Sequence, residues 1–203
     1  VNRYNCPLDG LPPGAKIGTS SPRRAAQLKK YAPQVEVVSI RGNVETRLRK
    51  AQGEEADGAI LAAAGMIRLG LQDQVAEYLS TSQFVPPPGQ GILAVEARAD
   101  DHRMLELLSA INDADTRYEA TAERAFLEKL GGGCSIPVGA YAQCVEDIMV
   151  MTIYMSTEDG EKNFTTKVRG LKRDPLQLAG DAYLALVEQG GADLVAAARA
   201  NQG

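Results

Sequence analysis

Residues 16–63 alternate between strand-like and helical segments, and this alternation restricts the possible folds more than any other feature of the sequence. The strand-like segments are short and apolar or β-branched, and they cover residues 16–19, 35–40 and 58–63. The helical segments between them cover residues 22–31 and 44–52. Ser21 and Asn43 fit the N-cap positions of these helices, and Pro22 fits a first helical position. Because strands that alternate with helices build a largely parallel sheet, we predict an α/β domain.

A stretch rich in proline and glycine at residues 80–91 interrupts this alternation and is typical of a hinge or crossover. After it we predict a strand over residues 92–98 and a helix over about residues 101–111. The chain therefore divides into three parts. We predict an α/β domain with anion-binding strand ends over residues 1–91, a crossover segment over 92–112 and a C-terminal α+β domain over 113–203.

The last third has the pattern of a small α+β domain. A helix is predicted over residues 116–130 by apolar residues that recur every four positions, namely Tyr118, Ala122, Phe126 and Leu130. Three strand-like stretches follow, over residues 140–145, 148–156 and 163–168. The second alternates in side-chain type, which indicates a strand with two distinct faces. We therefore predict a three-stranded antiparallel sheet.

Local signals predict how these last elements are joined. Residues 158–160, Glu-Asp-Gly, are typical of a hairpin turn. Asp174 is predicted to cap the final helix, with Pro175 in the first helical position and Gln177 completing a capping box.

Composition and charge exclude several classes of protein. The three cysteines lack CxxC spacing and there is one histidine, so we expect neither a disulfide framework nor a metal centre. No apolar stretch approaches the roughly 18 residues of a membrane span. A formal net charge of -4 does not favour a nucleic-acid partner. We therefore expect a cytoplasmic protein with no membrane or nucleic-acid partner.

Arginines follow the carboxyl ends of the three predicted strands, where ligands bind in open α/β sheets. They are Arg23 and Arg24 after the first strand, Arg41 and Arg47 after the second, and Arg68 after the third. Arg23 and Arg24 would lie in the first turn of a helix, where the helix dipole disfavours cations by a few tenths of a kcal/mol. A bound anion would reverse this cost, and the hydroxyls of residues 19–21 would add donors. This pattern predicts a site for several carboxylates or phosphates.

Each of these residues also has a simpler interpretation. Any one arginine could be an ordinary surface residue, and for Arg49, Lys29 and Lys30 we prefer a solvated position. Five arginines at one edge favour the anion site, although spacing alone does not identify the anion. Cys134 lies in a glycine-rich loop that could carry a reactive thiol, whereas a lone cysteine is more often packed as a small apolar residue. We expect Cys6 and Cys144 to be packed in this way, as small apolar residues.

Six segments together resemble the porphobilinogen deaminase (hydroxymethylbilane synthase) family. In one-letter code they are GTSSPRR at residues 18–24, SIRGNVETRL at 39–48, ILAAAGMIRLG at 60–70, PGQG at 88–91, TAER at 121–124 and GGCSIPVGAY at 132–141. They occur in the order of the family and cover nearly the whole chain. The second and the last of them are each specific.

The resemblance implies a function and a set of site residues. The family links four porphobilinogen units stepwise, with release of ammonia, and then releases hydroxymethylbilane by hydrolysis. The cysteine matching Cys134 carries a dipyrromethane cofactor through a thioether, and this cofactor primes the growing chain. The residues matching Ser21, Arg23, Arg24, Arg41 and Arg47 hold the cofactor, and those matching Arg23, Arg41, Arg47 and Arg68 hold the substrate.

Further expectations follow from the same resemblance. The fold should be of the periplasmic-binding-protein-like kind in the α/β domain. The ligands should be porphobilinogen and the growing linear polypyrrole, and the complete protein should be monomeric. Two departures are mild, since Pro22 stands where leucine is common and Ser135 where glutamine is common.

A larger departure concerns catalysis. The family's essential aspartate belongs to a first domain with no matching segment among these residues, and residues 92–112 would complete that domain. We therefore expect these 203 residues alone to be inactive. The alternative is an anion-binding half-cleft module without catalysis, from which Cys134 distinguishes the enzyme, because simple binding needs no thiol.

Overall fold

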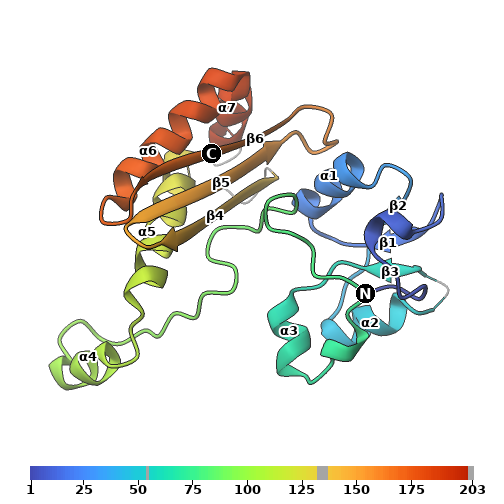
Figure 1. Ribbon diagram of the computed structural model, residues 1–203, viewed down its shortest axis with the longest axis horizontal. Coiled ribbons are helices and arrows are strands. Elements are labelled where there is room, and N and C mark those ends of the chain that lie inside the picture. The colour runs from blue at the N-terminus through green and yellow to red at the C-terminus, as the bar shows by residue number, and fades with distance from the viewer. Residues whose placement is uncertain (54, 132–136, 201–203) are drawn as a thin grey trace. The chain divides into compact units, whose positions relative to one another are not determined.

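The computed structural model describes residues 1–53, 55–131 and 137–200, which form two compact units (Figure 1). The first unit consists of Val1–Val85 together with residues 137–138 and Met155–Asn163, and the second contains the remaining described residues, 86–131, 139–154 and 164–200.

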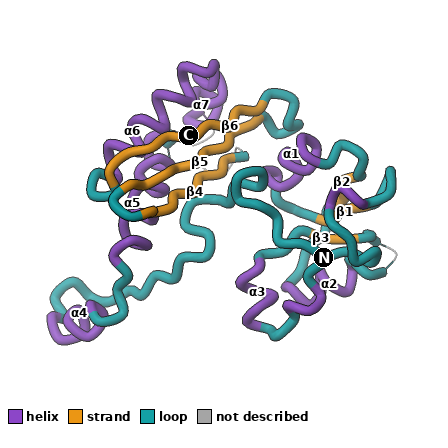
Figure 2. The backbone as a smooth tube through the Cα atoms, viewed as in Figure 1, coloured by secondary structure: helices purple, strands orange, loops and turns teal. Residues whose placement is uncertain are grey.

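The first unit contains a parallel sheet, as the alternating pattern predicts, and Figure 2 draws its strands in orange. Its strands are β1 (Lys16–Gly18), β2 (Glu36–Val38) and β3 (Gly58–Ala59), in the order β2-β1-β3. Ile17 of β1 is opposite Val37 on one side and Gly58 on the other. Every strand is shorter than we predicted, and residues 60–63, expected to continue β3, leave the sheet and enter a helix.

The helices of the first unit begin where local capping signals predict. They are α1 (Pro22–Tyr31), α2 (Val44–Lys50) and α3 (Ala63–Arg68), with short 3-10 turns at Leu8–Gly10 and Gln72–Gln74. The Ser21 side chain accepts a hydrogen bond from the Arg24 N–H at 3.4 Å, and the Asn43 side chain accepts one from the Thr46 N–H at 2.8 Å. Both predicted N-caps are thus confirmed, and they fix where α1 and α2 start relative to the strand ends.

Two apolar clusters hold this unit together. The larger one packs α1 against β1 and a distant segment of the chain, and its buried members are Leu11, Ala15, Ile17, Leu28, Ala32 and Phe84. The smaller one lies around β3 and contains Ile40, Ala51, Ala56 and Ala59. The strands are only two or three residues long, so these clusters contribute most of the apolar burial that fixes them.

The second unit combines helices with a three-stranded antiparallel sheet. Its elements are α4 (His102–Ser109), α5 (Ala114–Lys129), β4 (Val138–Val145), β5 (Ile148–Ser156), β6 (Asn163–Leu171), α6 (Pro175–Leu186), a π-helical turn (Val187–Gly191) and α7 (Ala192–Ala200). Helix α5 begins two positions before our prediction, because the Asp113 side chain accepts from the Thr116 N–H at 2.7 Å and acts as its cap. Its predicted apolar stripe is confirmed, with Ala122, Phe126 and Leu130 buried.

Strand β4 is at one edge of this sheet, and side chains of α5 cover that edge. The N–H groups of alternate β4 residues donate to acceptors outside the sheet. Ala142 N–H donates to Glu123 at 2.8 Å, and Cys144 N–H donates to Glu119 at 2.7 Å. Ala140 N–H donates to the Pro86 carbonyl at 2.9 Å. An uncovered row of donors would invite pairing with another chain, so these contacts protect the edge.

Two local predictions are wrong. Residues 92–98 form no strand, and Leu93 and Val95 are 76% and 61% exposed, because no described strand pairs with them. The Asp174 side chain makes no capping hydrogen bond, and Gln177 donates instead to Asp181 at 2.8 Å.

Strand β5 lies where the alternating side-chain types predict a strand. All its residues from Met151 to Ser156 are buried, so both faces are covered there. In the described part of the chain, no helix is long and apolar enough to cross a membrane.

Candidate functional site

The candidate site lies where β1 and β3 end and α1 begins. Beyond Gly18 the Thr19 N–H donates to the Val38 carbonyl at 2.9 Å, so the turn stays tied to the neighbouring strand. The Thr19 hydroxyl is buried and accepts from the Ser21 N–H at 3.2 Å. Together with the Ser21 cap, these contacts fix the turn that brings the first residues of α1 to the sheet edge.

Arg24 crosses from α1 to the end of β3. Its guanidinium donates to the Ile60 carbonyl at 2.9 Å, just beyond the last strand residue. Burial, and then the nearby positive charge of Arg47, lower the pKa of Arg24. A partly buried guanidinium that feels a second cation is unfavourable unless an anion is near.

Arg47 comes to the same edge from α2. Its Nε donates to the Gly42 carbonyl at 2.7 Å. Gly42 has φ +128, and a Cβ there would lie 2.7 Å from the Cγ2 of Thr46, so only glycine fits this turn. The sequence RGN at residues 41–43 thus makes the tight entry into α2 that positions Arg47.

Arg23 lies deeper than its neighbour Arg24, with only 8% of its surface exposed. Its guanidinium donates to the Val85 carbonyl. The amide of Gln27, one turn later on α1, contacts the same carbonyl at 3.4 Å. Our sequence analysis did not single out Gln27, because it looked at the spacing of the arginines. A glutamine beside Ala26 and Leu28 on a buried helical face is the signal that could have indicated it.

The structure brings only part of the predicted arginine set together. Arg41 follows β2 and is exposed. Arg68 is exposed as well and is the last residue of α3. At 1.5 Å per residue, it lies roughly 7.5 Å along the helix axis from Ala63, the first residue of that helix. Of Arg41, Arg47 and Arg68, only Arg47 lowers the pKa of Arg24, and within the described ranges none of these four arginines forms an ion pair with a carboxylate.

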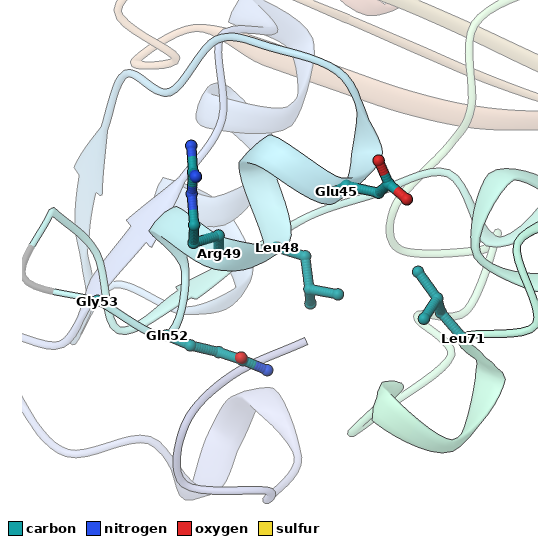
Figure 3. Close-up of a pocket in the computed structure, with 6 residues that line it drawn as sticks. All are labelled: Glu45, Leu48, Arg49, Gln52, Gly53 and Leu71. Carbon is teal, nitrogen blue, oxygen red and sulfur yellow. The ribbon is translucent and has the colours of Figure 1, made fainter.

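The carboxylates nearest in sequence have other roles. Asp57 accepts from the Lys16 N–H at 2.8 Å and forms an ion pair with Arg3 at 3.1 Å, at the start of β1 rather than its end. Glu45 lines an open pocket on α2 (Figure 3). That pocket is lined by Glu45, Leu48, Arg49, Gln52, Gly53 and Leu71. Arg49 therefore belongs to a different face of α2 from Arg47, as the helical spacing predicts.

Cys134 lies outside the described residues, and its role stays a prediction. The other two cysteines are free thiols. Burial, followed by the charges of Glu119 and Asp115, raises the pKa of the Cys144 thiol to about 11. Cys144 is therefore a poor nucleophile at neutral pH.

Glu123 is a second residue that our sequence analysis did not single out. It is 3% exposed, and its carboxylate accepts from the Gly89 N–H at 2.6 Å and the Ala142 N–H at 2.8 Å. Burial raises its pKa, and these two hydrogen bonds oppose the rise. This one side chain therefore connects the segments PGQG and TAER with strand β4 within the second unit.

Comparison with known proteins places most of the chain in two family models. Residues 1–106 match the model described as "Porphobilinogen deaminase, dipyromethane cofactor binding domain", and residues 117–187 match "Porphobilinogen deaminase, C-terminal domain". The chain is 44% identical over 193 residues to the porphobilinogen deaminase of Roseiflexus sp. (strain RS-1), covering 93% of this chain and 62% of that protein. It is 45% identical over 187 residues to the probable porphobilinogen deaminase of Nitrosopumilus maritimus (strain SCM1), covering 92% and 60%. The chain thus spans about three fifths of the length of these curated relatives.

Proposed function

The chain belongs to the porphobilinogen deaminase family, and on that premise we propose that it is the cofactor-binding and substrate-binding part of a hydroxymethylbilane synthase. In the complete protein this enzyme would condense four porphobilinogen units on a dipyrromethane primer attached to Cys134. Ammonia would leave at each condensation, and hydrolysis would release hydroxymethylbilane.

The observation that carries this proposal is the pair formed by Arg24 and Arg47. Arg24 is partly buried, both guanidinium groups are oriented by backbone carbonyls, and neither is neutralised by a carboxylate among the described residues. Dipyrromethane and porphobilinogen carry acetate and propionate side chains. Several carboxylates close together are the ligand that such a pair of cations fits, since guanidinium binds carboxylate in a bidentate way.

The residues of this chain would then bind and orient. Arg24, Arg47 and Arg23 would hold carboxylates of the cofactor, with the Ser21 hydroxyl and the start of α1 as further donors. Arg41 and Arg68, both exposed, would reach carboxylates of the incoming substrate alongside Arg23 and Arg47. When bound, the dipyrromethane primes the growing chain. The fixed positions of the arginines would set the register of the carboxylates.

We propose that the proton transfers use an aspartate outside these 203 residues. In support, the carboxylates nearest the site in sequence have other roles: Asp57 pairs with Arg3 at the start of β1, and Glu45 lines the pocket on α2. General acid–base help contributes about 10²- to 10⁴-fold to such steps. A polypeptide of these residues alone should bind the anionic substrate without turnover, and product formation by it would contradict this part of the proposal.

The experiment compares Arg47→Ala with the matched control Arg49→Ala in the complete protein. Both changes remove one cation from α2, but only Arg47 is close to Arg24. Loss of a charged hydrogen bond costs about 1.5–3 kcal/mol, so Arg47→Ala should weaken cofactor loading or raise KM about 10- to 150-fold. Arg49→Ala should change either quantity less than twofold. Equal effects of the two changes would overturn the site, and retained carboxylate binding without any turnover would favour the half-cleft alternative.

Cofactor attachment is tested separately. Intact and peptide mass spectrometry of the holoprotein should find the dipyrromethane adduct on Cys134. The raised pKa of the Cys144 thiol supports this choice over Cys144. An adduct on Cys6 or Cys144 would refute it.

The remaining assignments are proposals that rest on the family. We propose a periplasmic-binding-protein-like arrangement of the α/β part, with domain limits at residues 1–91, 92–112 and 113–203. We also propose a cytoplasmic location, supported by free thiols at Cys6 and Cys144, and a monomeric complete protein. Cell fractionation and light scattering test the last two.

A further inference from the structure

Val85 has an unusual position in the backbone. It is fully buried and is followed by three prolines, so it carries the last backbone N–H donor before Gly89. Val85 lies outside the strands of the described chain, so its N–H and carbonyl form no hydrogen bonds within a sheet. These buried groups therefore need side chains as hydrogen-bond partners.

Gln27 supplies those partners from α1. Its side chain is fully buried. Its Oε1 accepts from the Val85 N–H at 2.7 Å, and its Nε2 lies 3.4 Å from the Val85 carbonyl and 3.3 Å from the Arg23 carbonyl. The Gln27 amide thus contacts both the N–H and the carbonyl of Val85. The neighbouring residue, Phe84, packs against Tyr31 with ring centroids 5.7 Å apart.

The same Val85 carbonyl is an acceptor for the guanidinium of Arg23. Gln27 and Arg23 therefore converge on one oxygen atom from successive turns of α1. If Gln27 did not hold Val85, this acceptor could shift and the direction of the Arg23 guanidinium would shift with it.

We propose that Gln27 is a positioning residue for Arg23. It fixes the Val85 carbonyl, and this carbonyl orients the buried guanidinium toward the carboxylates of substrate or cofactor. The inference rests on the proposed function, because it assumes that Arg23 binds carboxylate. Gln27 itself does not touch the ligand, and its effect passes through Val85.

The test uses the complete holoprotein and measures KM and kcat for porphobilinogen together with thermal stability. Gln27→Met keeps the length of the side chain but removes both its acceptor and its donors. It should raise KM about three- to tenfold, the ratio for the loss of one net hydrogen bond, with a smaller change in kcat. Leu28→Ala is the matched control, since Leu28 is equally buried on α1 but packs into the apolar cluster. It should lower thermal stability at least as much and leave KM unchanged.

A second variant keeps the test informative if Gln27→Met folds poorly. Gln27→Glu retains an acceptor for the Val85 N–H, but its second oxygen replaces the Nε2 donor and faces the carbonyls of Val85 and Arg23. The Val85 carbonyl should therefore lose its contact with residue 27, and KM should rise as in Gln27→Met. An unchanged KM in Gln27→Glu would overturn the positioning role.

A double-mutant cycle separates this inference from the proposed function. Arg23→Met should raise KM, and adding Gln27→Met to it should raise KM no further. Additive effects would overturn the coupling of Gln27 to Arg23. A raised KM in Arg23→Met with no change in Gln27→Met would overturn the positioning role alone. No change in Arg23→Met would overturn the binding role of Arg23, and this inference with it.

Discussion

Glu123 offers the sharpest test of how the second unit is held together. Its carboxylate receives two backbone N–H groups, from Gly89 and Ala142, at 2.6 and 2.8 Å. A buried donor that loses its partner costs about 1–3 kcal/mol, so Glu123→Ala should lower the free energy of unfolding by about 2–6 kcal/mol. Glu123→Gln retains one acceptor oxygen and should cost less.

Glu119 is the matched control, one turn earlier on the same helix. It receives a single backbone N–H, from Cys144 at 2.7 Å, and it is only partly buried. Glu119→Ala should therefore cost about 0.5–1.5 kcal/mol, the net value of one hydrogen bond. Urea unfolding gives both values, and hydrogen exchange should show faster exchange of the Gly89 and Ala142 amides only in the Glu123 variants. Equal losses for Glu119→Ala and Glu123→Ala, or unchanged exchange at Gly89, would refute the reasoning.

The pH dependence of the same site has a defined sign. Burial raises the pKa of Glu123, so the folded protein keeps this proton to a higher pH than the unfolded chain. The contribution of Glu123 to stability is therefore complete below pH 4.5, the ordinary pKa of a glutamate carboxyl, and decreases as pH rises through the raised pKa. Glu123→Gln lacks this titration. The free energy of unfolding of wild type relative to Glu123→Gln should fall over that window.

Two further predictions concern Gly160 and Cys144. Gly160→Ala and Gly14→Ala both place alanine at positive φ, +78 and +80, which costs about 1–2 kcal/mol. Only at Gly160 would the new Cβ meet a neighbour, the Cα of Ala26 at 3.1 Å. Gly160→Ala should therefore lower the free energy of unfolding in urea by ~1–3 kcal/mol more than Gly14→Ala does. Equal losses for the two variants would contradict this. The pKa of the Cys144 thiol is about 11, so its labelling by iodoacetamide should be slow at pH 8 and should become about tenfold faster per pH unit. A labelling rate that reaches a plateau below pH 9 would contradict the raised pKa.

The features that could be predicted from sequence are those set by neighbours along the chain. Ser21 and Asn43 could be predicted as caps because a cap accepts from a backbone N–H close in sequence. In both cases that N–H belongs to the residue three positions later. The arginines after the strands were predicted to gather because parallel strands end at one edge, and Arg47 is close enough to lower the pKa of Arg24, after the larger effect of burial. Residues 92–98 have the composition of a strand, but a strand exists only if another strand pairs with it.

The residues that sequence reasoning missed act over long separations. Gln27 meets Val85 across 58 positions, and Glu123 meets Gly89 across 34. A polar residue on a buried helical face indicates that a partner exists, but local pattern does not say which backbone group it is. The role of Cys134 came from the family resemblance rather than from its surroundings.

In the proposed site, Arg24 and Arg47 are held by the backbone rather than by carboxylates. Each donates to a backbone carbonyl, of Ile60 and Gly42 respectively. A carboxylate partner would orient a guanidinium equally well, but it would also cancel the charge that attracts an anion. A carbonyl has only a partial charge, so it fixes direction while the full positive charge remains. The cost is the burial of Arg24 and, after it, the nearby charge of Arg47, which together lower the pKa of Arg24, and a bound polycarboxylate would offset both. Lysine at these positions would keep the charge but lose the planar fork that the carbonyls orient, so charge alone should not restore binding.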